Sequence, residues 1–453
     1  MTAREQYRSK AIKTLCDEFV KYNHIDATYY DKLDVKRGLR NSDGTGVLAG
    51  LTLICNVHGY LLNEGERQPI EGELIYRGIN INDLVNGSVS EKRFGYEETV
   101  YLLLFGALPT KSQLQHFRDI MANFRELPEH FIDDTIIKVP ARNVMNKLSR
   151  SVLALYSYDD EAENGSLEHE IRKAIQIISC LPTIMVNSFQ IKRRHYDNES
   201  MFMHPLNPQE STAESILSTL RPDRKYTPEE ARLLDLCLTL HAEHGGGNNS
   251  TFACRVLTSS GTDAYAAYAA AIGALKGPRH GGANIKVMEM LNYIKEGVQN
   301  WDDEEEVLNF LRKIMAKEAG DRSGLIYGIG HAVYTKSDPR AVILKKNAMD
   351  LARNTAFEPE FKLLETVERM APVAYAERKS DGKVLCANVD LYSGLVYKML
   401  GIPDELFTPL FAVARMAGWS AHRMEEIING KRIIRPAYKA VAKPQIYLPI
   451  DER

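Results

Sequence analysis

The sequence has 453 residues, more than one hydrophobic core usually organises, so we expect two domains or one domain with an insertion. Hydrophobic residues make up 44% of the chain, which excludes an intrinsically disordered protein. The formal net charge is −3 and the basic residues form no long run, which argues against a nucleic-acid-binding protein.

The first residues predict a helix rather than a targeting segment. Glu5, Asp17 and Glu18 are acidic, whereas a secretory signal needs an apolar run and a transit peptide avoids acids. No stretch of eighteen apolar residues occurs in the sequence, so we expect no membrane partner. These features together predict a cytoplasmic protein.

Most later elements are predicted to be helices. Tyr96–Gly106 begins with acids and ends with glycine, and Thr227 with Pro228 has the cap and first-turn residues of a helix start. Ser166–Arg193 predicts one long helix, or two helices that break near Pro182. Further helices are expected at Asp263–Lys276, Asp303–Ala319, Asp338–Arg353, Glu358–Ala371 and Asp404–Ile428.

Strand signals are few. Val47–Val57 and Leu74–Arg77 predict a small N-terminal hairpin, and Leu61–Gly72 between them is expected to be a long linker. Asp197–Thr212 is polar and predicts a surface loop. The predicted fold class is therefore all-α and multi-helical with a minor β hairpin, and the absence of an internal repeat excludes a helical solenoid.

Two histidines precede a run of three glycines. His241 and His244 are three residues apart and are expected on one helix face, and Gly245–Gly247 should end that helix. Such a pair could be half of a metal site, but no carboxylate or cysteine with ligand spacing accompanies it. The six cysteines also share no CxxC spacing, so we expect no metal. A histidine pair packed at a helix end is the simpler alternative.

Two further histidines lie among glycines. His280 precedes a predicted helix, whose N-terminus would favour a neutral ring that can donate to a carbonyl gaining negative charge. His331 follows Gly328, Ile329 and Gly330, which indicates backbone pressed closely against another group. This is no dinucleotide-binding fingerprint, because Val333 stands where the third glycine would be.

Four charged residues occupy unusual positions. Asp390 lies between apolar residues at a predicted helix start, where it could be a simple cap or, if buried, a base with a raised pKa. Arg340 opposes the dipole in the first turn of its helix, which indicates a task such as holding a carboxylate. Arg415 lies within the apolar FAVARMAGW, and Arg435 lies near the C-terminus, where surface solvation is the simpler interpretation.

Taken together, these motifs resemble the citrate synthase family. HAEHGGGNNSTF, GPRHGGAN, GIGHAVYTKSDPRA, NVDLYSGLVYKMLGIP and ARMAGWSAHRME occur in the family's order, and GELIYRGININDL is similar to its opening block. The resemblance covers the chain from about Gly44 onward. Five ordered motifs are a specific signal, which no single one of them would be.

The resemblance implies an acyltransferase that condenses acetyl-CoA with oxaloacetate and water, giving citrate and CoA through an enol. His280 would donate to the thioester carbonyl, Asp390 would remove the methyl proton, and His331 would protonate the ketone. The coenzyme A thioester is a co-substrate, and no cofactor is implied. Oxaloacetate would be held by His244, Arg340, Arg415 and Arg435, and coenzyme A would contact Gly328, Ile329 and Gly330.

The resemblance also implies an architecture. Residues 1–282 and 401–453 would form a large helical domain, and the inserted residues 283–400 would form a small domain that closes over the active site. In the family, the arginine that matches Arg435 comes from the partner subunit, which implies a homodimer with shared active sites. Ile329 stands where the family often has an aromatic or small residue. The N-terminal β-domain of the hexameric, NADH-inhibited branch is not evident in the sequence.

Three alternatives stay open or are disfavoured. A 2-methylcitrate synthase would use propionyl-CoA with the same catalytic residues, and one methylene discriminates by only about 1–3 kcal/mol, so the acyl preference is not settled by sequence. An ATP-dependent citrate-cleaving enzyme is disfavoured because the chain has no Walker loop. A catalytically inactive helical scaffold is disfavoured because His280, His331 and Asp390 are all present.

Overall fold

The structure is a computed structural model that describes residues 3–41, 43–63, 66–378 and 384–452. Its contacts divide the chain into two units, Met1–Leu51 and Thr52–Arg453. The first unit contains helix α1 (Ala3–Tyr22), helix α2 (Thr28–Lys32) and the short helix η1 (Arg37–Leu39). The second unit contains the sheet and all remaining helices, and the candidate site residues lie within it.

A three-stranded antiparallel sheet opens the second unit. Strand β1 (Cys55–Asn63) pairs with β2 (Glu66–Tyr76), which pairs with β3 (Ile79–Asn80). The prediction of a linker at Leu61–Gly72 was wrong for its described residues, because 61–63 belong to β1 and 66–72 belong to β2. The outer half of a hairpin is held by backbone hydrogen bonds and needs no alternation of apolar and polar residues. Its polar sequence therefore gives no signal by which the strands could be predicted.

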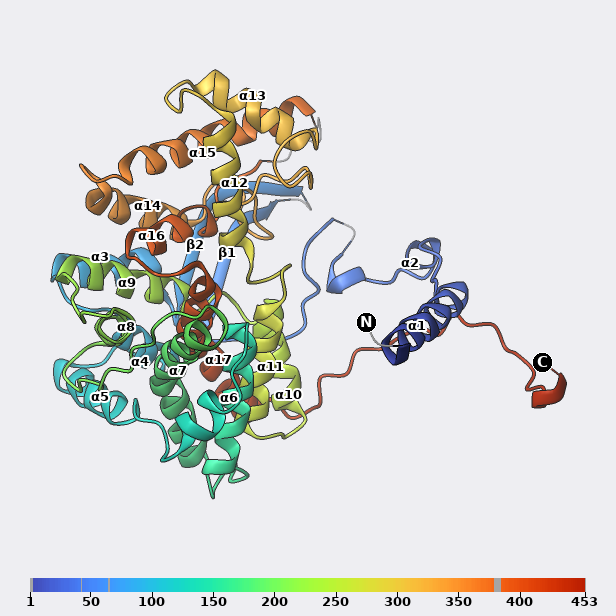
Figure 1. Cartoon of the computed structure of the whole chain (residues 1–453), viewed down its shortest axis with the longest axis horizontal. Helices are drawn as coiled ribbons and strands as arrows, with labels where there is room; N and C mark the ends of the chain where they lie inside the picture. The colour runs from blue at the N-terminus through green and yellow to red at the C-terminus, as the bar shows by residue number, and fades with distance from the viewer. Residues whose placement is uncertain (1–2, 42, 64–65, 379–383, 453) are drawn as a thin grey trace. The chain divides into compact units, whose positions relative to one another are not determined.

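The helical part follows in chain order, and its elements are shown in Figure 1. The first half contains α3 (Ile81–Ser90), α4 (Tyr96–Phe105), α5 (Lys111–Asn123), the π-helix η2 (Ile132–Ile137), α6 (Val144–Ala154), η3 (Leu155–Tyr158), α7 (Leu167–Tyr196), α8 (Thr212–Leu220), α9 (Pro228–His241), α10 (Asn249–Ser259) and α11 (Ala264–Lys276). The second half contains α12 (Ala283–Gly297), α13 (Glu304–Met315), α14 (Pro339–Ala352), α15 (Glu358–Arg378), α16 (Asp390–Met399), η4 (Asp404–Leu406), α17 (Phe407–Asn429) and η5 (Ile450–Glu452).

Capping residues set the helix boundaries largely where the sequence indicates. Thr227 and Glu230 form a capping box at the start of α9, with Pro228 as its first residue. Gly106 ends α4 with φ of 84°, a left-handed conformation that costs glycine little. The all-α fold class with a small sheet is confirmed.

Helix α7 is continuous through Pro182, so the prediction of one long helix holds over that of a broken pair. This helix is long and apolar enough to cross a membrane by composition, but 89% of its most apolar window is buried inside the fold. Such burial is typical of a core helix, and α7 packs against α17, α6 and α8.

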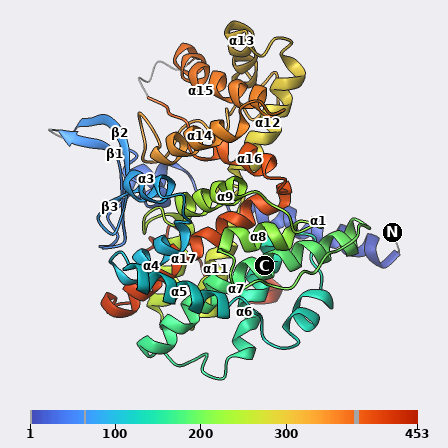
Figure 2. The ribbon, with the colours of Figure 1, turned by 90° about the vertical axis from the view of Figure 1, so that its left-hand side faces the viewer.

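Helix α17 lies at the centre of the larger helical group. It contacts α4, α7, α9, α10 and α11, and Figure 2 shows it running through the middle of these helices. Its side chains are almost all buried from Phe407 to Glu425, including Arg415. A charge in this position is therefore embedded in the core.

Helices α12 to α16 gather above this group in Figures 1 and 2. They pack on one another, with contacts of α12, α14 and α15 to α16 and of α13 to α15. These helices fall within residues 283–400, the segment expected to form an inserted closing domain. The domain boundaries and the closure stay predictions.

Candidate active site

The predicted residues lie at helix ends and in the loops that join helices. His244 follows α9, His280 precedes α12, His331 precedes α14, and Asp390 opens α16. His241 is the last residue of α9, so the prediction that His241 and His244 share a helix face was wrong. Gly245, with φ of 85°, turns the chain away after the helix has ended.

The rings of His244, His331 and Tyr334 form a cluster in which His331 stacks on Tyr334 and His244 meets both rings edge-on. The His244 and His331 ring centroids are 5.1 Å apart, and the His331 ring stacks on Tyr334 at 4.6 Å. The Tyr334 hydroxyl lies 3.2 Å from His244 Nε2. Burial, followed by the charge of Arg340, holds the pKa of His244 well below its usual range, so this ring is neutral. Sequence reasoning did not select Tyr334, which is 2% exposed.

His280 is held as a neutral ring by the start of α10. The Ser250 backbone N–H donates to His280 Nε2 at 3.3 Å, and Ser250 Oγ lies 2.9 Å from the same nitrogen. Because Nε2 accepts, the proton of the neutral ring is on Nδ1. Burial and the charge of Arg415 lower the pKa of His280 to about 4, so the ring stays neutral at physiological pH. Nδ1–H is then the donor that His280 offers to a substrate.

The His331 ring is held through its Nδ1 nitrogen, whereas the His280 ring is held through Nε2. Its Nδ1 accepts hydrogen bonds from the backbone N–H groups of Val333 and Tyr334, each at 3.0 Å. These two amides place the proton of the neutral ring on Nε2. Both histidines can therefore donate a hydrogen bond to a carbonyl oxygen without carrying a charge.

A short β-bridge between Ile329 and Ala387 joins the segment before His331 to the segment before Asp390. Gly330 N–H donates to Cys386 O at 2.7 Å, and Asn388 N–H donates to Gly328 O at 2.9 Å. The Asn388 side chain adds a bond to Gly330 O. Gly328 and Gly330 both have positive φ, and a Cβ on Gly328 would lie 2.9 Å from Leu391 Cα. The predicted coenzyme contact of Gly328–Gly330 stays a prediction, and the role visible here is to fix the segment before His331 to the segment before Asp390.

Asp390 is a partly buried carboxyl in the first turn of α16. Burial, reinforced by the nearby Asp338 charge, raises its pKa to about 6 against the opposing effect of Arg340 and Arg415. A carboxyl with this pKa is mostly ionised at neutral pH and is a stronger base than an exposed aspartate. Its environment therefore fits the predicted role of a base.

Arg340 is 4% exposed and forms a two-point ion pair with Asp338. Nε donates to Oδ1 at 3.0 Å and Nη2 donates to Oδ2 at 2.7 Å. Asp338 also caps α14 through the Arg340 backbone N–H. The Asp338 carboxylate thus offsets the unfavourable interaction between the Arg340 cation and the helix dipole. From the sequence, Asp338 was predicted only to start the helix.

Arg415 is 1% exposed and only partly satisfied. Its Nε donates to His241 O at 2.7 Å, and its guanidinium stacks over Phe411 at 4.7 Å. Its Nη2 has no hydrogen-bond partner among the described residues. A buried, unsatisfied donor on a cation costs on the order of 1–3 kcal/mol, and an anionic ligand would remove that cost. Arg415 affects the pKa of His244, His280 and Asp390, so all four groups share one electrostatic environment.

Arg435 is not brought to this cluster. It is exposed, and the neighbouring Ile434 N–H donates to Ser259 Oγ at the end of α10. Ser250, which holds His280, lies at the other end of the same helix. Nine residues of α-helix separate these serines by about 13 Å. Within one chain, Arg435 therefore lies a helix length from the other predicted residues.

Sequence reasoning missed the residues that hold the candidate side chains in place: Ser250, Tyr334, Asp338 and Asn388. Ser250 and Tyr334 do lie inside the motifs HAEHGGGNNSTF and GIGHAVYTK, three to six residues from a selected histidine. Their roles depend on contacts between distant segments, such as Ser250 with His280, and a linear pattern does not contain those contacts.

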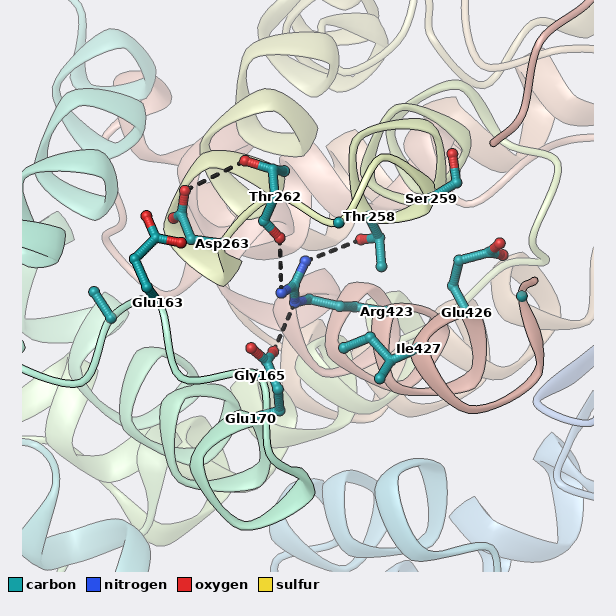
Figure 3. A pocket seen from close by; sticks show the side chains of 13 residues that line it. Glu163, Gly165, Glu170, Thr258, Ser259, Thr262, Asp263, Arg423, Glu426 and Ile427 are labelled. Carbon is teal, nitrogen blue, oxygen red and sulfur yellow. Dashed lines mark hydrogen bonds and ion pairs between the residues drawn. The ribbon is translucent and has the colours of Figure 1, made fainter. Parts of the chain in front are cut away.

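A cavity of about 290 Å³ lies elsewhere, at the Ser259 end of α10. Figure 3 shows Arg423 among its lining residues, bonded to Glu170 at 2.9 Å, Thr258 at 3.2 Å and the Thr262 carbonyl at 3.1 Å. Each nitrogen of this guanidinium donates to a protein group, whereas Nη2 of Arg415 has no such partner among the described residues.

Comparison with known proteins agrees with the resemblance found in the sequence. Residues 43–437 match the family model for the citrate synthase C-terminal domain. "Citrate synthase 2" of Bacillus subtilis is 36% identical over 392 residues, covering 85% of this chain and 94% of that protein. The citrate synthase of Synechocystis is 34% identical, covering 84% and 89%.

Solved structures agree in fold. The citrate synthase of Pyrobaculum aerophilum matches with a TM-score of 0.72 and 30% identity, over 90% of this chain and 94% of that one. That of Thermoplasma acidophilum, a ternary complex with carboxymethyl coenzyme A and oxaloacetate, matches with a TM-score of 0.74 and 26% identity, over 92% and 99%. Together with the site, these matches define an acyltransferase that converts the acyl group into an alkyl group on transfer.

The chain belongs to the citrate synthase family, whose general reaction is the condensation of acetyl-CoA with oxaloacetate.

Proposed function

We propose that this enzyme condenses acetyl-CoA with oxaloacetate and water to give citrate and CoA, using His280, Asp390 and His331. The observation that carries the proposal is the pair of neutral histidines, each with one nitrogen that accepts from backbone N–H, which places the ring proton on the other nitrogen. A carboxyl with a raised pKa, Asp390, lies in the field of Arg415, which also lowers the pKa of His280.

In the first step, Asp390 removes a proton from the methyl carbon of acetyl-CoA. The electron pair of the broken C–H bond forms the C=C bond of an enol, and negative charge moves to the thioester oxygen. His280 Nδ1–H donates to that oxygen. A thioester methyl is too weak an acid for a lone carboxylate, so the base and the donor have to act together.

In the second step, the enol carbon attacks the ketone carbon of oxaloacetate. The ketone oxygen gains an electron pair and takes the proton from His331 Nε2. His244, Arg340 and Arg415 hold the oxaloacetate, and an oxaloacetate carboxylate satisfies the free Nη2 of Arg415. Water then attacks the thioester carbonyl and the C–S bond breaks, giving a carboxylate and the thiol of CoA. Of the two water protons and the one held by Asp390, one restores His331, one completes the thiol and one is released.

This scheme uses no metal and no prosthetic group, because protein donors supply the stabilisation of negative charge at both oxygens. Closure of residues 283–400 over bound oxaloacetate would exclude water until the carbon–carbon bond has formed, since premature hydrolysis of acetyl-CoA is the competing reaction.

Arg435 enters the scheme through a second subunit. Its position a helix length from its own site supports an active site completed across a homodimer. Mixing Arg435→Ala with Asp390→Asn chains tests this, because a mixed dimer would contain one site with both changes and one intact site. We expect about a quarter of wild-type activity after subunit exchange. No recovery above the separate variants would refute the shared site.

The test of the overall function is the rate of thiol release from acetyl-CoA and from propionyl-CoA, each with and without oxaloacetate. Oxaloacetate-dependent release that favours acetyl-CoA is the expected result. Faster release from propionyl-CoA would identify a 2-methylcitrate synthase, and no release from either would leave an inactive scaffold.

A further inference from the structure

The hairpin β1–β2 contains an irregularity beside the catalytic loop. His58 pairs with Glu73 and Tyr60 pairs with Pro69. One residue of β1, Gly59, therefore stands opposite three residues of β2, 70 to 72. A bulge of this kind bends the strand and leaves backbone groups free of the ladder.

Two glycines at this bulge allow a loop to lie directly on the strands. A Cβ on Gly59 would lie 2.6 Å from Tyr334 Cα and would also overlap the Val333 carbonyl. A Cβ on Gly72 would lie 2.8 Å from the Tyr334 ring and would overlap the Ser337 carbonyl. Any side chain at either position would displace the loop, because such distances lie below van der Waals contact.

The loop is bound to the bulge by its hydroxyl groups. Thr335 Oγ donates to the Gly59 carbonyl and lies 3.4 Å from the Ile70 carbonyl. Ser337 Oγ donates to Glu71 and accepts from the Gly72 N–H at 3.1 Å. The carbonyls that the bulge removes from the sheet ladder are thus the acceptors that Thr335 uses.

The same loop carries the ring cluster of the site. Val333 and Tyr334, whose backbones press on Gly59, supply the two amides that fix the His331 tautomer. Tyr334, between the two glycines, stacks on His331 and reaches His244. A shift of the loop would therefore alter the donor to the ketone and the ring that contacts it.

We propose that the bulge formed by Gly59 and residues 70–72 is a socket for the loop 333–337, and that Thr335 is a positioning residue for oxaloacetate binding through His331 and Tyr334. The inference rests on the proposed function, since it assigns the socket to the oxo-acid half of that reaction. Thr335 itself acts through its neighbours and does not touch the substrate.

The test compares Thr335→Val, which removes the hydroxyl at nearly constant volume, with Thr335→Ser, which keeps it. Thr335→Val should raise the KM for oxaloacetate roughly 3- to 10-fold, as expected for one lost hydrogen bond, and leave the KM for acetyl-CoA within about 2-fold. Thr335→Ser should restore the wild-type value. The rise in Tm on adding oxaloacetate should fall in Thr335→Val and return in Thr335→Ser, a readout that needs no turnover.

Lys336→Ala is the matched control, because Lys336 is exposed on the same loop. It should leave both KM values unchanged. An unchanged oxaloacetate KM in Thr335→Val, an equal rise in the acetyl-CoA KM, or no rescue by serine would overturn the socket while the proposed function stands. A wild-type enzyme without oxaloacetate-dependent thiol release would refute the proposed function, and the role of the socket with it.

Discussion

His280 and His331 are two neutral histidines that carry their protons on opposite ring nitrogens. His280 accepts a backbone hydrogen bond at Nε2 and presents Nδ1–H, whereas His331 accepts two at Nδ1 and presents Nε2–H. The amide that holds His280 comes from a distant residue, Ser250 at the start of α10, and the two amides that hold His331 come from its own loop. One ring is therefore positioned by tertiary packing and the other by local backbone.

The difference shows how a protein selects a donor without charging it. A backbone N–H can only donate, so the nitrogen that it contacts has to be the unprotonated one. The other ring nitrogen then carries the proton and can act as a donor. The predictions below test this arrangement, from the largest expected effect to the smallest.

Removing the proposed base, Asp390, should nearly abolish the condensation reaction. Asp390→Asn should lower kcat about 10³-fold, within the range for loss of a positioned acid or base, with the fold intact by circular dichroism. Thiol release at saturating acetyl-CoA and oxaloacetate measures it. Turnover near the wild-type rate would assign the base to another residue.

Removing the unsatisfied cation should act on oxaloacetate binding. Arg415→Leu should raise the KM for oxaloacetate roughly 10- to 100-fold, because it deletes a charged hydrogen bond to an anion. Arg423→Leu is the matched control on the same helix, since Arg423 is buried and already paired with Glu170. The control should lose stability without changing that KM. Equal KM effects in the two variants would contradict the specific role of Arg415.

Amide substitutions should separate the two tautomers directly. Asparagine places its polar group near the Nδ1 position and glutamine near Nε2, so each can replace only one of the two nitrogens. His280→Asn should be about tenfold more active than His280→Gln, whereas His331→Gln should be about tenfold more active than His331→Asn, as one hydrogen bond of about 1.4 kcal/mol implies. The same order at both positions would show that the two rings do not present opposite nitrogens.

The pH dependence should reflect Asp390 before either histidine. The pKa of Asp390 is raised to about 6, so kcat/KM for acetyl-CoA should be half its plateau near pH 6 and fall tenfold per unit below. The pKa of His280 is about 4, so this ring does not limit the rate in that range. A plateau that extends unchanged to pH 5 would contradict the raised pKa.

The raised pKa also carries a stability consequence. Because the folded state holds the Asp390 proton more tightly than the unfolded chain, its ionisation destabilises the fold at neutral pH. That cost is fully present above about pH 6 and disappears as pH falls toward 4. Asp390→Asn should therefore be more stable than wild type at pH 7 and equal to it near pH 4, by chemical unfolding at both pH values.

Local signals predicted much of this molecule. The caps at Thr227 and Gly106, and the helices of the second half, follow from residues within one or two turns of each boundary. The candidate site residues could also be selected from the sequence, because glycines beside histidines and a charge inside an apolar run are visible in one segment; their roles in the reaction stay predictions.

Non-local contacts account for what sequence reasoning missed. The hairpin arms at Leu61–Gly72 are polar and are held by their partner strand. Asp338 is a cap by pattern, and only the folded chain reveals its ion pair with Arg340. Ser250 holds His280 because α10 begins beside this ring in the folded chain. The spacing of residues along the sequence gives no sign of that contact.

The bridge between Gly328–Gly330 and Cys386–Asn388 bears on how such an enzyme can evolve. It closes the excursion that contains α14 and α15, and His331 and Asp390 lie at the ends of that excursion. Lengthening a flexible loop costs little, about 0.6 kcal/mol for each doubling, so a change of length in the connection between α14 and α15 alters the closing entropy only slightly. The bridge can therefore keep the spacing of His331 and Asp390 while that connection varies in length.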